Sequence, residues 1–285
     1  MSVTKSNLLR TSVALTGIVI LAAIFAGCTG NNNNSNASGT VKVTGSTTVL
    51  PIAQATADAF MKNNAKADIQ ISGGGSGVGV TAAGDGTADI GMSSRDLTAA
   101  EVTKYPTLTK TTVATDCLVI VVHSSNTVSA LSIVQIKGIY NGTYKNWKDL
   151  GGSDLKITLI GRDSASGTRE YFTSVVMSKQ NTTAGMLELN SNGAVQSTVS
   201  TTPGAIGYVG LGYAGAPNKA LKIVVGSDQI EANSVNALTG KYPLARPLFM
   251  LTKGAPAGLA RTYIEFILSA EGQTIVEKEG FVKLK

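Results

Sequence analysis

The sequence predicts an α/β fold, and three observations support this prediction. Short runs of apolar and β-branched residues alternate with segments of helical periodicity along most of the chain. The chain has 285 residues, of which 43% are hydrophobic. That is enough for one large domain or for two domains of roughly 100–150 residues each. The 32 glycines indicate many tight turns and close backbone approaches.

The first half of this alternation predicts four strands separated by helices. Pro51 suits the first turn of a helix over residues 51–62. A second, short helix is expected to end at Ala83, and Thr98 with Glu101 forms a capping box that starts a third. The strands are expected at residues 41–44, 68–72, 88–92 and 113–123.

The second half continues the same pattern. A helical segment over residues 131–140 stops at Asn141 and Gly142, residues that often end helices. One further helix is expected to follow Thr168 and run to about Met177, and another to cover residues 259–268. Strands are expected at residues 155–161, 205–209, 221–225 and 247–251.

The N-terminal residues predict a targeting signal rather than a part of the fold. Lys5 and Arg10 precede a run of 14 apolar and small residues, 13–26, which is shorter than the roughly 20 residues of a membrane span. The run closes before Cys28 in a stretch that resembles the lipobox of lipoproteins, with phenylalanine where that box usually has leucine. We therefore expect a signal or lipoprotein segment over residues 1–27 and lipidation of Cys28. An uncleaved N-terminal anchor is the alternative.

A flexible tether is expected over residues 28–39, which are polar and low in complexity. Under either interpretation of the N-terminus, the folded part lies outside the cytoplasm. It is then anchored to the outer face of the cell membrane.

Four loops share one chemistry, and they are the most informative feature of the sequence. In each, a strand ends, Ser or Thr follows with small residues, and a helix begins; the loops are 45–48, 73–77, 93–95 and 162–168. The carboxyl ends of strands line the ligand crevice of an open α/β sheet. Helix N-termini there present unpaired amides and the positive end of the helix dipole. The recurrence predicts a site for a small oxyanion, with Arg95 and Arg162 as sources of positive charge.

Structural capping is the competing interpretation of these loops. Ser and Thr are ordinary N-cap residues, so any one such loop is explained without a ligand. The recurrence of the pattern four times, twice with an arginine, favours the anion site.

Composition disfavours several other functions. A single His and 2 Cys leave no residue set for most metal-dependent hydrolases or for a disulfide framework. Aromatic residues, at 5%, are too few for a nucleic-acid stacking platform, and a formal charge of +6 usually reflects solubility. Residues 77–82 match a dinucleotide fingerprint only loosely, and His123 is expected to be an ordinary strand-end residue. We therefore predict no metal, no cofactor and no nucleic-acid partner.

Several motifs resemble those of the phosphate-binding proteins of ABC importers. They lie in the order typical of that family, at residues 45–51, 74–77, 94–97, 146–152, 166–170 and 203–208. The resemblance implies a two-lobed periplasmic-binding-protein (type II) fold with the anion in a cleft. Lobe I would comprise residues 40–116 plus 249–285, and lobe II residues 117–248.

The resemblance also implies which residues hold the anion. In lobe I the ligands would be Ser46, Thr47, Ser76 and Ser94, with Arg95. In lobe II they would be Arg162, Ser166, Gly167 and Thr168. Some family members have aspartate where Ser94 stands, and that carboxylate accepts the proton of bound phosphate. Ser94 can accept a hydrogen bond but repels fully ionised sulfate far less.

The sequence thus favours a non-enzymatic receptor for inorganic phosphate that delivers it to an ABC transporter permease. The nearest alternative is the same architecture with another oxyanion, such as sulfate, molybdate or tungstate. A secreted phosphatase-like enzyme and a surface adhesion module are further alternatives. The lone histidine disfavours the enzyme.

Overall fold

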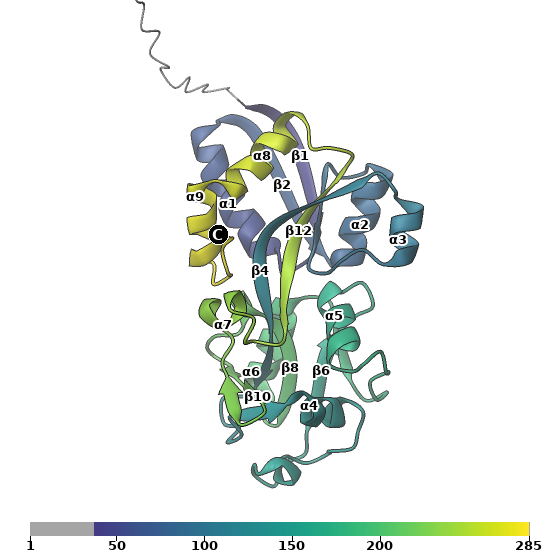
Figure 1. Cartoon of the computed structure of the whole chain (residues 1–285), viewed down its shortest axis with the longest axis vertical. Coiled ribbons are helices and arrows are strands. Elements are labelled where there is room, and N and C mark those ends of the chain that lie inside the picture. Colours follow the sequence, from purple (N-terminus) through teal and green to yellow (C-terminus); the bar gives the residue numbers. More distant parts are fainter. Residues whose placement is uncertain (1–36, 285) are drawn as a thin grey trace, which may run out of the picture. The chain divides into compact units, whose positions relative to one another are not determined.

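The computed structural model describes residues 37–284, which form two groups of helices and strands, each around its own hydrophobic core (Figure 1). We name these groups lobe I and lobe II. The core of lobe I draws on residues from Val41 to Ala114 and from Leu248 to Phe281. The core of lobe II draws on residues from Cys117 to Leu244. The expected signal or lipoprotein segment lies outside the described residues.

Lobe I is a sheet with helices packed on it. Its strands are β1 (Ser38–Gly45), β2 (Lys66–Gly74) and β3 (Ile90–Ser93), and its helices are α1 (Leu50–Asn63), α2 (Ser76–Asp85), α3 (Ala99–Lys104), α8 (Gly258–Leu268) and α9 (Ala270–Lys278). Strand β1 pairs in parallel with both β2 and β3, so α1 and α2 are crossover helices. In α1, Ile52, Thr56 and Phe60 recur every four residues and are buried, which fixes the face turned to the core.

Two long strands connect the lobes. Strand β4 (Leu108–Val122) pairs with β12 (Ala245–Lys253) along its first part and with β8 (Ala205–Gly210) along its last five residues. Residues Cys117 to Val122 are fully buried, which explains their continuous apolar run. Figure 1 shows β4 and β12 running side by side between the two groups. The sheet continues from β8 to β6 (Thr158–Arg162) and β7 (Leu187–Leu189). Both lobes therefore belong to one sheet, in the order β2-β1-β3-β12-β4-β8-β6-β7.

Lobe II covers the remaining strands of that sheet and a smaller one. Its elements are β5 (Ala130–Ser132), α4 (Ile133–Tyr140), η1 (Trp147–Leu150), β6 (Thr158–Arg162), α5 (Gly167–Val175), β7 (Leu187–Leu189), α6 (Asn192–Thr201), β8 (Ala205–Gly210), η2 (Leu211–Tyr213), β9 (Lys219–Ala220), β10 (Lys222–Val225), β11 (Asp228–Ile230) and α7 (Ser234–Leu238). Strands β11, β10 and β5 form the separate three-stranded sheet.

The structure confirms most of the expected elements and corrects some of their ends. The capping box of Thr98 and Glu101 is present at the start of α3. Ser38 and Gly39, which we assigned to the tether, belong to β1 and pair with β2. The expected helix over 131–140 begins only at Ile133, because residues Ala130–Ser132 form a strand paired with β10. Across residues 37–284, no helix combines the length and apolarity that crossing a membrane requires.

Candidate functional site

The four loops singled out from the sequence begin in the last residues of strands. Three of these strands, β1, β2 and β3, are neighbours in lobe I, and the fourth, β6, is in lobe II. All nine residues expected to bind an anion are buried: Ser46, Thr47, Ser76, Ser94, Arg95, Arg162, Ser166, Gly167 and Thr168. Burial of so many polar residues indicates that they share hydrogen bonds or a ligand.

The lobe I loops lie against one another. The Gly75 amide donates to the Gly45 carbonyl (2.9 Å), which holds the loops of Ser46 and Ser76 side by side. The Ser94 amide donates to Ser76 Oγ (3.1 Å), and the two hydroxyl oxygens are 3.3 Å apart. Lobe I therefore brings hydroxyls from three separate loops to the start of α2.

The loop of lobe II, residues 162–168, caps the N-terminus of α5. Ser166 Oγ accepts a hydrogen bond from the Arg169 amide (3.2 Å), so Ser166 is the N-cap of α5. The first amides of a helix have no intrahelical acceptor and lie at the positive end of its dipole. The amides of Gly167 and Thr168 are therefore suited to an anion.

The loops of the two lobes touch. The Gly77 amide donates to the Ala165 carbonyl (3.0 Å), and Thr48 Oγ1 lies 3.0 Å from Thr168 Oγ1. A Cβ atom built on Gly167 would lie only 2.2 Å from Ser76 Oγ. Glycine is required there because the opposite lobe approaches so closely. The predicted residues of lobe II thus meet those of lobe I at one buried place.

Arg162 supplies a positive charge to this place. Its side chain is held by donating from Nε to the Leu189 carbonyl and from Nη2 to the Asn190 carbonyl, both at 3.1 Å. Burial lowers the pKa of Arg162, and the charge of Arg246 lowers it further while Asp163 opposes this effect. A guanidinium nevertheless stays charged in proteins.

The Arg95 guanidinium is paired with carboxylates from both lobes. Its guanidinium donates to both carboxylate oxygens of Glu101 (2.7 and 2.8 Å), and its Nε lies 2.5 Å from Glu170 of lobe II. Although burial opposes it, the contacts with these two glutamates raise the pKa of Arg95. The charge of Arg95 is therefore balanced by carboxylates, whereas its backbone lies in the loop that follows β3.

A buried ion pair that the sequence analysis missed joins the connecting strands. Arg246 in β12 donates from Nε and Nη2 to Asp116 Oδ2 (2.9 and 2.8 Å), and the two residues are opposite each other in the sheet. Burial raises the pKa of Asp116, while Arg246 opposes this change. Arg246 Nη2 also donates to Thr168 Oγ1 (3.0 Å). A charged residue inside an apolar strand was the available signal, and it occurs at both positions.

Asn192 is a second missed residue. It is the first residue of α6, after the N-cap Ser191, and is fully buried. Its side-chain Nδ2 donates to Thr47 Oγ1 (3.1 Å) and to Thr48 Oγ1 (2.9 Å) across the lobes. The sequence here reads Asn-Gly, which is typical of a turn. Nothing local distinguishes it as part of a site.

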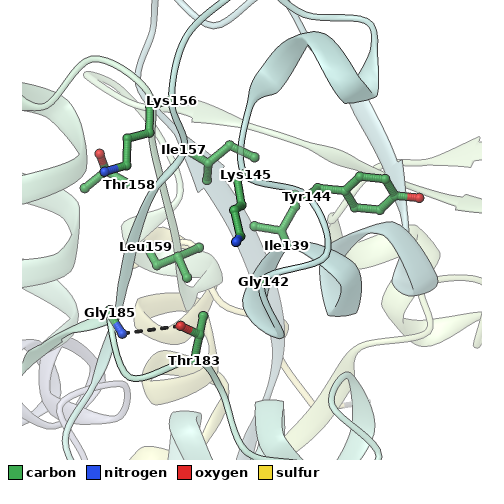
Figure 2. Close-up of a pocket in the computed structure, with 10 residues that line it drawn as sticks. All are labelled: Ile139, Gly142, Tyr144, Lys145, Lys156, Ile157, Thr158, Leu159, Thr183 and Gly185. Carbon is green, nitrogen blue, oxygen red and sulfur yellow. Dashed lines mark hydrogen bonds between the residues drawn. The ribbon is translucent and has the colours of Figure 1, made fainter.

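A separate cavity of about 290 Å³ lies at the other end of β6 (Figure 2). Thr158 lines it, whereas Arg162 at the opposite end of the strand belongs to the interlobe site, about 13 Å away at the usual rise of a strand. Lys145 points toward the middle of this cavity, which also has the apolar Ile139 and Leu159 in its wall. Within residues 37–284, no three His, Cys, Asp or Glu side chains are grouped so as to hold a metal ion.

The fold and the site together define a two-lobed anion-binding protein, and comparison with known proteins gives its family. Residues 30–271 match the PBP superfamily domain. Phosphate-binding protein PstS of Bacillus subtilis (strain 168) is 32% identical over 288 residues, which cover 98% of this chain and 94% of the relative. The chain therefore belongs to the PBP superfamily and, within it, to the family of PstS phosphate-binding proteins.

Solved structures agree with this assignment. A crystal structure from Clostridium perfringens, described as a phosphate ABC transporter substrate-binding protein with bound phosphate, matches with a TM-score of 0.82 at 35% identity. The match covers 87% of this chain and 100% of that one. An ABC-type phosphate transport receptor from Vibrio cholerae matches with a TM-score of 0.70 at 30% identity, over 86% of this chain and 100% of that one. These matches confirm the two-lobed periplasmic-binding-protein fold expected from the sequence.

Proposed function

We propose that this protein binds inorganic phosphate outside the cytoplasm and delivers it to the membrane permease of an ABC importer. One observation carries the proposal: buried hydroxyls, helix-start amides and Arg162 come together from two lobes at one place. Ligand contacts from both lobes favour the closed arrangement, because the open arrangement has only one half of them. The PstS relatives and the phosphate-bound neighbour support phosphate as the anion.

The nine residues expected from the sequence are proposed as the phosphate site, with different roles. The hydroxyls of Ser46, Thr47 and Ser76 and the amides of Thr47 and Ser76 would bind from lobe I, whereas the Ser46 amide donates to the Met92 carbonyl. Arg162 and the α5 start would bind from lobe II, where Ser166, Gly167 and Thr168 lie. For Ser94 we propose the hydroxyl as the ligand, since its amide donates to Ser76 Oγ. For Arg95 we propose that it acts by holding this loop in place, since its guanidinium contacts two glutamates.

Selectivity is proposed to involve the Ser76–Ser94 pair. Either hydroxyl can donate in this pair; when Ser94 donates to Ser76, the Ser94 oxygen keeps lone pairs for a proton on the ligand. Sulfate, molybdate or tungstate would make no use of that acceptor. Titration calorimetry with phosphate, followed by competition with these anions at several pH values, tests the proposal. Absence of phosphate binding at millimolar concentration would overturn it.

The protein is proposed to perform no bond chemistry. A hydrolase that relied on histidine would need His123, which lies just beyond the far end of β4 and contacts Ser125 (Nδ1 to Oγ, 2.7 Å). That is about 23 Å of strand from Asp116 at the interlobe site. A chromogenic phosphate ester provides the test, and turnover by the wild-type protein above the uncatalysed rate would contradict the proposal.

We also propose the anchoring and the lobe boundaries expected from the sequence. Lipidation of Cys28 and a tether would hold the receptor at the outer face of the membrane, next to its permease. Mass spectrometry of protein from the membrane fraction, with Cys28→Ser as the control, tests this anchoring. Lobe II is proposed to span residues 117–248, supported by its core, which draws on residues from Cys117 to Leu244.

A further inference from the structure

Two buried residues outside the proposed ligand set control the direction of hydrogen bonds at the site. We infer that Asn192 and Arg246 are positioning residues that orient the Thr47 and Thr168 hydroxyls as hydrogen-bond donors toward the anion. This inference rests on the proposed function. It follows from counting, atom by atom, the donors and acceptors of five buried groups.

The orientation of the Asn192 amide is fixed first. The Gly210 amide donates to Asn192 Oδ1 (3.2 Å), so this oxygen is the acceptor and Nδ2 carries the two hydrogens. Nδ2 then donates to Thr47 Oγ1 and to Thr48 Oγ1. Since Gly210 is at the end of β8, the sheet of lobe II determines which end of the amide faces lobe I.

The Thr47 hydroxyl is left with only its hydrogen. A hydroxyl oxygen has two acceptor lone pairs and one hydrogen. Thr47 Oγ1 accepts from both the backbone amide (3.4 Å) and the side-chain Nδ2 (3.1 Å) of Asn192. Both lone pairs are therefore engaged, and the remaining interaction that Thr47 can make is to donate.

Counting lone pairs and hydrogens in the same way for Thr48 and then for Thr168 also makes the Thr168 hydroxyl a donor. Thr48 Oγ1 accepts from Asn192 Nδ2 (2.9 Å). One Arg246 Nη2 hydrogen is on Asp116 Oδ2, so Thr168 Oγ1 (3.0 Å) and Thr48 Oγ1 (3.4 Å) share the other in a three-centre bond. The Thr48 hydrogen is then directed to Thr168 Oγ1 at 3.0 Å. Thr168 Oγ1 also accepts from Arg246 Nη2 (3.0 Å). With both lone pairs engaged, the Thr168 hydroxyl is a donor to whatever the site holds.

The consequence is a preorganised pair of donors, one from each lobe. A hydroxyl that is free to rotate must be ordered when the anion binds, whereas one fixed beforehand loses little entropy. Two such donors match unprotonated oxygens of an oxyanion and cannot accept a proton from it. Asn192 and Arg246 thus contribute to affinity without contacting the ligand.

A double-mutant cycle tests this inference in the full-length chain. The variants are Thr47→Val, Asn192→Ala and the pair, with Asn218→Ala as the control. Asn218 is also a buried asparagine of lobe II, and its Nδ2 donates to the Gln196 carbonyl (2.8 Å) rather than to a site threonine. Calorimetry with inorganic phosphate gives the affinities, and melting temperatures without phosphate report folding.

We expect each single substitution to weaken phosphate binding roughly tenfold, as one lost hydrogen bond to a charged ligand does. If Asn192 acts through Thr47 and Thr48, the double variant loses less than roughly thirtyfold in phosphate affinity. Asn218→Ala leaves affinity unchanged. The inference is overturned if the double variant loses nearly a hundredfold in phosphate affinity, or if Asn192→Ala loses none. If Asn192→Ala does not fold, the cycle is run with Asn192→Leu, which has nearly the same volume and carries neither a donor nor a charge.

These outcomes are separable from those of the proposed function. If the wild-type protein binds no phosphate, the proposed function fails. If the wild type binds phosphate and the two substitutions act independently, only the positioning role fails.

Discussion

Arg95 of lobe I and Glu170 of lobe II form an ion pair across the lobes, with Nε 2.5 Å from Oε2. Arg95 is nearly buried and also holds Glu101 within its own lobe, whereas Glu170 is half-exposed at the start of α5. The pair therefore joins the loop after β3 to the helix that begins at Ser166. It exists only when the lobes are together, so it stabilises the closed arrangement.

The first prediction concerns this ion pair. Glu170→Gln removes the charge and keeps the shape, and we expect phosphate affinity to fall roughly two- to fivefold at low salt. The loss should shrink at high ionic strength because salt screens exposed charges. Glu265→Gln is the matched control, since Glu265 pairs with Arg261 on the surface of α8. Equal affinities of Glu170→Gln and wild type at low salt would contradict a closing role.

The second prediction uses the close approach at Gly167. In Gly167→Ala the new methyl would meet Ser76 Oγ at 2.2 Å and Ser76 Cβ at 2.7 Å, but only when the lobes close. Phosphate affinity should fall roughly ten- to hundredfold, because overpacking costs about 1–3 kcal/mol. The melting temperature without phosphate should change little. Gly193→Ala, at a position with nothing within 4 Å, should leave binding intact.

The third prediction concerns the buried positive charge. Arg162→Ala should weaken phosphate binding roughly tenfold or more, because the anion loses a charge-assisted partner. Arg162→Lys keeps a charge but not the planar fork, so it should recover part of the loss. The control for net charge is Arg261→Ala, which removes a positive charge from an exposed ion pair with Glu265 on α8. Near-unchanged affinity in Arg162→Ala, measured by calorimetry, would remove Arg162 from the site.

The fourth prediction is a pH dependence of stability. Burial opposes the change, but hydrogen bonds from Arg95 and Thr98 lower the pKa of Glu101 below its ordinary value of 4.5. A lowered carboxylate pKa stabilises the fold above the unfolded pKa, and this contribution is lost as pH falls through the folded pKa. Urea unfolding should therefore show Glu101→Gln to be less stable than wild type at neutral pH. The difference in free energy of unfolding between wild type and Glu101→Gln should narrow below about pH 4.5. A difference that does not change with pH would contradict a lowered pKa of Glu101.

The sequence was sufficient to predict features with a local cause. Ser166 could be recognised as a helix start because capping depends on neighbours within three residues. The loops of Ser46, Ser76 and Ser94 were predictable from the strand-loop-helix pattern, although neither α1 nor α2 has a side-chain cap. Their meeting followed from a rule about the carboxyl ends of strands.

The features that the sequence did not reveal depend on distant partners. Arg95 was expected to face the anion because nothing local shows that Glu170 comes against it from the other lobe. Asp116 and Arg246 pair through the register of β4 and β12, which the local sequence does not encode. Asn192 follows a helix cap but reads as a turn, and its role depends on α6 meeting the loop of Thr47.

The path of the chain through β12, α8 and α9 has a consequence for biogenesis. These last elements complete lobe I, whereas the core of lobe II comes from one continuous stretch ending at Leu244. As the polypeptide emerges vectorially from a ribosome or a translocation pore, lobe II can assemble while lobe I still lacks its C-terminal helices. Nascent chains stalled before Ala245 would then carry a folded lobe II and an incomplete lobe I, and proteases would cleave lobe I.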